Sequence, residues 1–225
     1  MFTTELKFIV NGDTARVFEA WARTTTIPDP HAIDPTGDGY RTSTLYFDTD
    51  RFELYFRRGS TARAKFRIRR YNGAPEVFLE RKLRLNNKRV FKRRSTITLD
   101  DLAQVARGRH DSPGGWFTRR LQHRRLRPVC QINYRRTARL GVQDSQPIRI
   151  TIDYDITASV LQAIAFADDG AMEILPGRAI VELKYGLNMP SLFQDAINRF
   201  QLSPHSLSKY RLAVRELNLC SGLPE

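Results

Sequence analysis

Alternation of apolar and polar residues with a period of two is the dominant pattern in this chain. In the first example, Leu6, Phe8 and Val10 alternate with Glu5 and Lys7. Such alternation is typical of antiparallel strands that bury one face and leave the other polar. We expect strands of this kind at residues 5–10, 42–48, 63–69, 77–85, 127–137, 148–156 and 180–185.

Helical spacing of apolar residues is less frequent. The clearest case is residues 13–23, where Val17, Phe18 and Trp21 share one side. Further helices are expected at residues 99–107, 116–125, 190–202 and 207–217, and a loop at residues 26–39. No linker divides the chain, so one domain over residues 1–225 is the simplest interpretation. Many strands with a few peripheral helices predict an α+β fold built on an antiparallel β-barrel or tunnel.

The composition is that of a globular protein. The chain has 225 residues, of which 41% are hydrophobic and 27% charged, a balance too apolar for disorder. The sequence shows no secretory leader and no apolar run long enough to span a bilayer. Cys130 and Cys220 do not make a disulfide framework, so we interpret both as reduced thiols and expect a cytoplasmic protein.

The charge is unevenly distributed along the chain. The formal net charge is +13, yet residues 57–139 alone carry 25 basic and 5 acidic residues, whereas the segments before and after them are slightly acidic. Such a concentration of positive charge favours a polyanionic partner. Arginine outnumbers lysine 30 to 7, which suits bidentate phosphate contacts, although a GC-rich genome would produce the same bias.

The polar faces of several predicted strands are mainly basic. Lys65, Arg67 and Arg69 stand at every second position, roughly 7 Å apart along a strand. A solvated outer face would explain any single strand of this kind. If several such strands share a closed sheet, however, their cations form an inward-facing cage, and a bound polyphosphate would offset their repulsion.

Acidic residues are sparse on these faces. Glu5, Glu80 and Asp153 each lie close to a lysine or arginine in the pattern, so cross-strand ion pairs are the expected role for them. For Glu182, in the segment Val181–Lys184, we favour a metal ligand instead. Phosphoryl transfer usually needs a hard divalent cation, and such cations bind carboxylate oxygens.

Signatures of other chemistries are missing from the sequence. It contains no phosphate-binding P-loop and no dinucleotide-binding glycine motif. It also lacks a Cys-x-x-Cys pair for zinc and the serine elbow of hydrolases. The four histidines fall outside the alternating strands, so we expect surface positions for them and no histidine general base.

An ordered set of short motifs, running from residue 5 to residue 210, resembles the VTC (vacuolar transporter chaperone) domain. That domain is the polyphosphate polymerase fold of the triphosphate tunnel metalloenzymes. Each motif alone is weak, and the ordered set is specific. The matching pieces are Glu5–Phe8, Leu45–Asp48, Lys65–Tyr71, Phe78–Lys82, Arg127–Pro128, Tyr134–Ala138, Arg149–Asp153, Val181–Lys184 and Ser208–Tyr210.

The resemblance implies roles for fourteen residues. Residues expected to act on the transferred phosphates are Arg67, Arg69, Lys82, Arg136, Arg149 and Lys209. Residues expected to bind phosphate around them are Lys7, Lys65, Lys92, Arg93, Tyr134, Lys184 and Ser208. Lys92 and Arg93 are alternatives for one position, because residues 86–94 are interpreted as a cation-rich turn of uncertain register. Glu182 matches the glutamate that binds the metal.

The implied reaction is transfer of the γ-phosphoryl group of ATP to a growing polyphosphate chain, with manganese or magnesium as the divalent cation. The attacking phosphate oxygen is already deprotonated, so positioning and charge neutralisation carry the catalysis. ATP and polyphosphate are then the partners, with no specific nucleic acid. The regulatory domain and membrane helices of the eukaryotic polymerases are not seen here, which leaves a membrane-protein partner open.

Two other functions stay open. The hydrolytic branch of the superfamily carries Glu-x-Glu-x-Lys on its first strand, and residues 3–7 read Thr-Thr-Glu-Leu-Lys, without the first glutamate. A tunnel enzyme that hydrolyses triphosphate or short polyphosphate is therefore the first alternative. The second is a module that binds polyanions, including nucleic acid, without catalysis.

Overall fold

The structure, a computed structural model, describes residues 4–32, 37–59, 64–84, 90–167 and 170–222. These residues form an α+β protein with ten strands of one large sheet and six helices. The chain divides into two compact units, each assembled from three separate stretches. Unit 1 comprises Met1–Arg41, Tyr134–Ile156 and Leu175–Leu207, and unit 2 comprises Thr42–Asn133, Thr157–Ile174 and Ser208–Glu225.

Unit 1 contains two helices and an antiparallel arrangement in which β1 pairs with β10, and β10 with β8. The short strand β2 pairs with β7. The elements that lie wholly within unit 1 are β1 (Thr4–Asn11), α1 (Gly12–Thr25), β2 (Ile27–Pro28), β10 (Arg178–Tyr185) and α5 (Ser191–Arg199). Three strands pass from one unit into the other, namely β3 (Gly39–Asp48), β7 (Arg127–Gln143) and β8 (Gln146–Val160).

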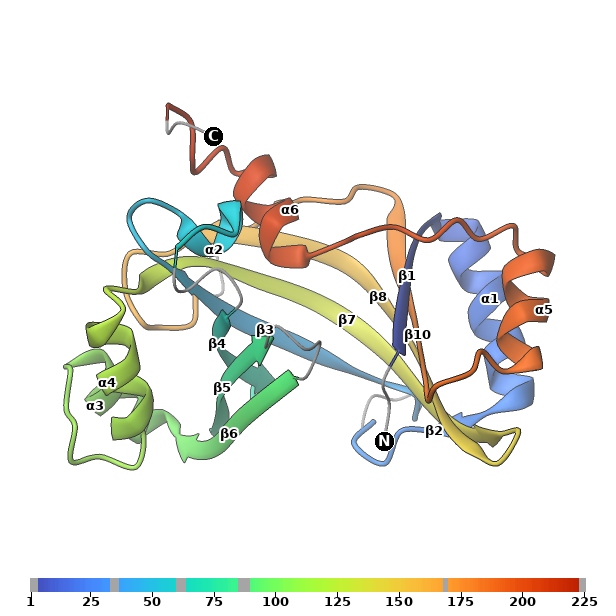
Figure 1. The fold of residues 1–225 in the computed structure, drawn as a ribbon, viewed down its shortest axis with the longest axis horizontal. Helices are drawn as coiled ribbons and strands as arrows, with labels where there is room; N and C mark the ends of the chain where they lie inside the picture. Colours follow the sequence, from blue (N-terminus) through green and yellow to red (C-terminus); the bar gives the residue numbers. More distant parts are fainter. Residues whose placement is uncertain (1–3, 33–36, 60–63, 85–89, 168–169, 223–225) are drawn as a thin grey trace. The chain divides into compact units, whose positions relative to one another are not determined.

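The core of unit 1 lies between the apolar face of β1, β10 and β8 and the helices α1 and α5, which lie side by side (Figure 1). The ring of Phe18 on α1 packs against that of Phe200, with 5.1 Å between the ring centres. The ring of Phe193 on α5 packs against that of Tyr185, with 6.0 Å between the ring centres. Asn11 caps α1 by accepting a hydrogen bond from the Thr14 amide. Because one face of these strands is covered by the helices, the opposite face must carry their polar residues.

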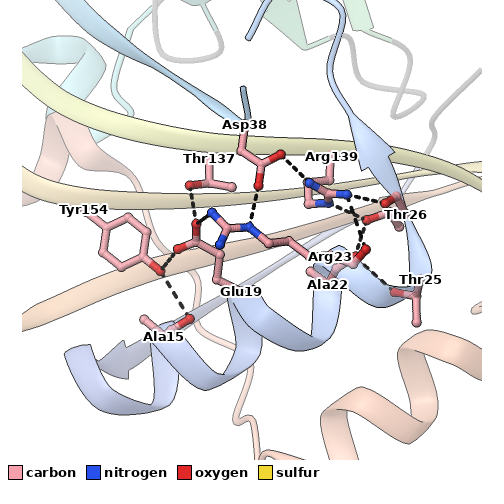
Figure 2. A network of polar contacts seen from close by, with 10 residues as sticks. All are labelled: Ala15, Glu19, Ala22, Arg23, Thr25, Thr26, Asp38, Thr137, Arg139 and Tyr154. Carbon is pink, nitrogen blue, oxygen red and sulfur yellow. Dashed lines mark hydrogen bonds and ion pairs between the residues drawn. The ribbon is translucent and has the colours of Figure 1, made fainter. Parts of the chain in front are cut away.

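A partly buried polar network fixes α1 to the strands of unit 1. Figure 2 shows Arg23 between Glu19 and Asp38, while Arg139 binds Asp38 and the Thr26 carbonyl. The Tyr154 hydroxyl donates to Glu19 at 2.6 Å. Burial and the neighbouring Glu19 raise the pKa of Tyr154. The members satisfy one another, so we assign this network to the fold and not to ligand binding.

Unit 2 is built on an antiparallel meander in which β4 pairs with β3 and with β5, and β5 pairs with β6. Its remaining elements are α2 (Glu53–Phe56), β4 (Ala64–Tyr71), β5 (Glu76–Arg84), β6 (Val90–Thr98), α3 (Leu99–Ala106), α4 (Gly115–His123), β9 (Met172–Glu173) and α6 (Lys209–Glu216). Thr98 begins α3 with a capping box, in which Thr98 and Asp101 bind each other's backbone amides.

Helix α4 covers one face of this meander. The centre of the Phe117 ring lies 5.6 Å from that of Phe47 and 6.1 Å from that of Phe66, and all three residues are buried. The other face of β3 meets α6, since the Tyr210 hydroxyl donates to Asp48 at 2.6 Å and its ring stacks on Tyr46. Burial raises the pKa of Asp48, although the hydrogen bonds it accepts oppose the shift.

The predicted strands and helices are all present. The structure adds three short elements that the sequence did not predict, namely α2, β9 and β2, the last of which lies in the expected loop at residues 26–39. Residues 86–94 were expected to form a turn, but Val90–Thr98 is strand β6. Its polarity conceals it, because Ile97 is its single buried residue and polar side chains occupy both faces. Residues 85–89 and Arg63, at the ends of predicted segments, lie outside the described residues.

The predicted tunnel is supported in part. The strand order β1-β10-β8-β7-β3-β4-β5-β6 has β1 and β6 as its end strands, and no ladder of the described residues joins these two. Closure of the sheet, and the action of the two units as one domain, therefore stay predictions. No helix in the described part of the chain is both long and apolar enough to cross a membrane.

Candidate functional site

The polar face of unit 1 carries charged residues that the strand register sets opposite one another. Lys7 of β1 pairs with Glu182 of β10, and Glu5 pairs with Lys184. Residues opposite one another in an antiparallel ladder point to the same side of the sheet. These four side chains therefore share the face that points away from α1 and α5.

The two carboxylates on this face share the same two lysines. The Lys7 ammonium lies 2.8 Å from Glu5 and 3.5 Å from Glu182. The Lys184 ammonium lies 2.6 Å from Glu182 and 3.5 Å from Glu5. Glu182, predicted as a metal ligand, is 5% exposed and makes ion pairs in this structure. Its metal role stays a prediction.

Glu5 forms the ion pairs that the sequence predicted for it, and its place beside Glu182 also makes it a candidate site residue. Burial and the neighbouring Glu182 act to raise the pKa of Glu5, but Lys7 and Lys184 outweigh them, so that its pKa is lowered overall. Glu5 is therefore ionised at neutral pH, beside a second carboxylate. In the sequence, the signal that Glu5 belongs to the candidate site was its place in the Glu-x-Lys segment of the first strand.

The carboxylate pair fits a divalent cation that is completed by phosphate oxygens. Among the described residues, no group of three or more histidines, cysteines and acids is arranged to hold a metal. Magnesium, however, is commonly held by one or two carboxylates together with substrate phosphates and water. Glu5 and Glu182 would supply two hard oxygen ligands, and the other ligands would come from the substrate.

Arg136 is held by a buried partner. Its guanidinium donates two hydrogen bonds to Asp153, at 2.6 Å and 2.8 Å, and the Asp153 side chain is 0% exposed. Burial acts to lower the pKa of Arg136, but Asp153 outweighs it and raises the pKa well above its ordinary value. The guanidinium also lies over the ring of Tyr134 at 5.2 Å. These two predicted site residues are therefore in contact.

Arg149 forms an ion pair with a buried carboxylate and also has a buried N–H group that no described residue binds. It lies 2.7 Å from the buried carboxylate of Asp29 and 3.2 Å from the Tyr40 hydroxyl. Within the described residues, its buried Nε atom and the hydroxyl of Thr151 have no hydrogen-bond partner. Register sets Arg149 opposite Lys184, and Thr151 opposite Glu182, on the same polar face. Buried polar atoms normally find a partner, which a ligand or water could supply here.

In unit 2, five predicted cations share one face of the meander, namely Lys65, Arg67, Arg69, Lys82 and Lys92. Lys65, Lys82 and Lys92 stand opposite one another on β4, β5 and β6, and form a row that we call the lysine row. Two residues further along, Arg67 stands opposite Glu80, which stands opposite Arg94. Like charges directly opposite one another are unfavourable in a sheet, so the lysine row favours an anion.

Glu80 is the carboxylate of this face. It lies 2.5 Å from Arg67 and 3.6 Å from Arg94. Burial acts to raise its pKa, but Arg67, Arg69 and Arg94 outweigh burial, so the pKa of Glu80 is lowered. Arg69 itself is buried and donates to the Thr44 hydroxyl at 3.1 Å. The ion pair that the sequence predicted for Glu80 is present.

The register separates the alternatives Lys92 and Arg93. Lys92 belongs to the lysine row, whereas Arg93 stands opposite Arg81 and so points to the face covered by α4. There its guanidinium lies 4.2 Å from the centre of the Trp116 ring. Of the two, Lys92 is therefore the one that shares a face with Lys65 and Lys82.

Ser208 and Lys209 lie at the start of α6, with Ser208 as its N-cap residue. The next residue, Tyr210, stacks on Tyr46 at 5.4 Å. Tyr46 stands opposite Arg67 in the β3–β4 ladder. The start of α6 is thereby held on the same face of unit 2 as Arg67 and the lysine row.

Comparison with known proteins identifies the family. The VTC domain matches residues 2–218, nearly the whole chain. The chain belongs to the VTC-domain family. The resemblance of its motifs to the VTC domain is thereby confirmed. No curated protein sequence matches this VTC-domain chain significantly.

Two solved structures share the fold of this VTC-domain protein. A candidate adenylate cyclase from Bacillus halodurans is 14% identical, with a TM-score of 0.54, and the match covers 91% of this chain and 92% of that one. HpAC1 from Hippeastrum, a candidate adenylyl cyclase with a dominant triphosphatase activity, is 13% identical, with a TM-score of 0.56 and 95% of both chains covered. At these identities the likeness shows the fold alone.

The structure thus gathers the predicted site residues, with the exception of Arg93, into two sets, one in each unit. The set in unit 1 consists of Lys7, Tyr134, Arg136, Arg149, Glu182 and Lys184, with Glu5, Asp29 and Asp153 as their acidic partners. The set in unit 2 consists of Lys65, Arg67, Arg69, Lys82, Lys92, Ser208 and Lys209, with Glu80 as the partner of Arg67. Asp29 was the least visible from sequence, because it lies in the predicted loop at residues 26–39.

Proposed function

We propose that this VTC-domain protein is a metal-dependent phosphotransferase that adds the γ-phosphoryl group of ATP to a polyphosphate chain. The observation that carries the proposal is the pattern on the polar faces, where predicted phosphate ligands stand in register on neighbouring strands. A phosphate chain repeats its charge at short intervals, as does the lysine row. Positive charge repeated along such a face can follow that chain.

The chemistry needs little more than these cations. A terminal phosphate oxygen of the growing chain is the nucleophile, and it is already deprotonated at neutral pH. Cations that neutralise and align the two phosphate chains can therefore carry most of the catalysis. The Nε atom of Arg149 and the Thr151 hydroxyl, which have no partner among the described residues, are suitable donors to a phosphate oxygen.

A divalent cation at Glu5 and Glu182 would neutralise charge on the transferred phosphoryl group when bound. Lys7 and Lys184 already sit between these carboxylates. In the absence of the cation, the two ammonium groups balance the carboxylate charges and keep both side chains on the polar face. With a cation bound to these carboxylates, Lys7 and Lys184 would be able to bind phosphate oxygens instead.

Hydrolysis of triphosphate or short polyphosphate is the second candidate. The specific observation in its favour is the structural likeness to HpAC1, which has a dominant triphosphatase activity. The same basic faces would bind its substrate, and water would replace the phosphate nucleophile. The first strand lacks one glutamate of the hydrolytic pattern, since position 3 is threonine, and this favours the polymerase.

The test is incubation of the purified protein with ATP and manganese, followed by measurement of both long-chain polyphosphate and free phosphate. Long-chain product supports the polymerase, and free phosphate without chain growth supports the hydrolase. Glu182→Gln keeps the shape and removes the charge, so turnover should fall by about a hundredfold or more. Asp195→Asn, an exposed carboxylate on α5, is the matched control and should keep full activity.

Two results would refute the proposal. If neither product forms under any divalent cation, the chain is a polyanion-binding module and not an enzyme. If Glu182→Gln turns over like the wild type at saturating manganese, Glu182 is an ion-pair partner of Lys184 and nothing more.

A further inference from the structure

A hollow of about 560 Å³ opens on the surface of unit 2, beside helix α4 and strand β6. Its volume is within the range of ordinary small-molecule sites. It lies on the helix-covered face of the meander, because Arg93 points there while the lysine row points to the opposite face. The lining residues are Arg93, His110, Trp116, Arg119, Arg120 and His123, with Gln122.

Positive charge accumulates around this hollow. Burial lowers the pKa of the neighbouring Arg81, and repulsion from Arg120, Arg93 and Arg124 lowers it further. In the described part of the chain, the buried Nε atom of Arg81 has no hydrogen-bond partner. Guanidinium groups that are close enough to shift one another's pKa make the empty hollow electrostatically unfavourable, and an anion would relieve this.

The described acidic residues do not pair with the arginines that line the hollow. No described carboxylate forms an ion pair with Arg93, Arg119 or Arg120. Asp111, in the segment before α4, is bound instead by Arg109 through two hydrogen bonds of 3.1 Å and 2.9 Å. The guanidinium groups of the lining therefore remain available to an external anion.

Two arginines of the lining, Arg93 and Arg119, are held in place before any ligand arrives. The Trp116 indole donates to Ser95 at 2.8 Å, and the fixed ring supports the Arg93 guanidinium 4.2 Å above it. Arg119 donates to the His110 carbonyl at 3.0 Å. At Gly115 any Cβ would lie 1.9 Å from that carbonyl oxygen, so only glycine lets the preceding segment pack so closely on α4. Preorganised donors lose less entropy when they bind.

We propose that this hollow is a second anion site, which binds a chain of phosphate groups. Arginine presents planar pairs of donors that match phosphate oxygens, and the lining supplies three of them. A nucleic acid fits the hollow less well, because base stacking needs a free aromatic face and Arg93 already covers Trp116. The site is independent of the proposed polymerase reaction, since it lies on the opposite face from the lysine row.

The test uses inorganic tripolyphosphate as the probe, without ATP or divalent metal. The chain has two tryptophans, Trp21 and Trp116, so Trp21→Phe leaves Trp116 as the only indole and its fluorescence reports on the hollow. A saturable change is expected on titration. Adding Arg120→Gln should raise the dissociation constant about tenfold or more, because a charge-assisted contact is lost. Adding Lys82→Met should leave the midpoint within about twofold, because Lys82 points to the other face.

The proposal is overturned if tripolyphosphate gives no Trp116 signal, or if the signal follows Lys82 and not Arg120. It is also overturned if a DNA duplex binds there more tightly than tripolyphosphate, with the steep salt dependence of nucleic-acid binding.

Calorimetry on the full chain with both native tryptophans is the second measurement, in case Trp21→Phe unfolds the protein. The double variant Arg119→Gln/Arg120→Gln should bind tripolyphosphate with one binding event fewer than the wild type. The control variant Arg16→Gln/Arg199→Gln should keep all binding events, and their retention in the first variant would refute the site. Both assays measure binding of tripolyphosphate without ATP or metal, so a failure of the proposed polymerase activity would not change their results.

Discussion

Replacement of Arg136 by methionine separates structural stabilisation from ligand binding at a predicted site residue. The Asp153 carboxylate is 0% exposed and receives two hydrogen bonds from Arg136, whose own side chain is 12% exposed. Methionine keeps much of the volume but leaves that charge in the core without its guanidinium. Breaking a buried ion pair by removing one partner costs about 3–5 kcal/mol. For a protein of this length, this corresponds to a fall in melting temperature of roughly 6–20 °C.

The matched control is the preceding residue of the same strand. Arg135 pairs with the exposed Asp155 at 3.6 Å and is 43% exposed, so Arg135→Met should cost less than about 1 kcal/mol. Denaturant unfolding followed by circular dichroism gives both free energies of unfolding. The double variant Arg136→Met/Asp153→Asn should recover a large part of the loss, because it removes the buried charge together with its partner.

The reasoning is refuted if Arg136→Met unfolds within about 1 kcal/mol of the wild type, or if it costs no more than Arg135→Met. The result also decides how activity data are interpreted. If the predicted loss is found, a lack of turnover in Arg136→Met reflects unfolding as much as a lost phosphate contact. Variants in the lysine row are then the cleaner probes of ligand binding.

Two further predictions concern the charged face of unit 2. The pKa of Glu80 is lowered on folding, so its ion pairs stabilise the protein above the ordinary carboxyl pKa, and this contribution is lost as pH falls through the lowered value. Glu80→Gln should therefore be less stable than the wild type at neutral pH, and the gap in unfolding free energy should close as the pH falls below the ordinary carboxyl range; a constant gap would contradict the pKa shift. Lys82→Met should shrink the rise in melting temperature that tripolyphosphate causes, which for a hundredfold excess over Kd is equivalent to about 2.7 kcal/mol in the wild type. Arg16→Met is its control, and equal shifts in both variants would exclude Lys82 from the phosphate site.

Local chemistry along the chain was sufficient to predict most of the secondary structure. Each strand with one apolar face shows a period of two, because one face packs on helices while the other does not. The exception is β6, whose polar residues occupy both faces, so that periodicity could not distinguish it from a turn. The family could also be read from the sequence, since its motifs are short, ordered and spread over nearly the whole chain.

The sequence also determined which residue types were available for the site, but not how they pair. It predicted that Lys65, Arg67 and Arg69 share a face, because this follows from the period of a single strand. The opposition of Lys65, Lys82 and Lys92 depends on the register of two ladders, which no single strand determines. The choice between Lys92 and Arg93 is of the same kind, since a shift of one residue moves a side chain to the other face.

Only the tertiary structure decided which charges neutralise one another. Arg149 meets Asp29, and Glu5 comes beside Glu182, through contacts between residues more than a hundred positions apart. The energy of an ion pair depends on distance and burial, and neither quantity is written in the order of residues. The arginine-lined hollow beside α4 arises in the same way, because it forms only where Arg93 of β6 meets a helix that follows it in the chain.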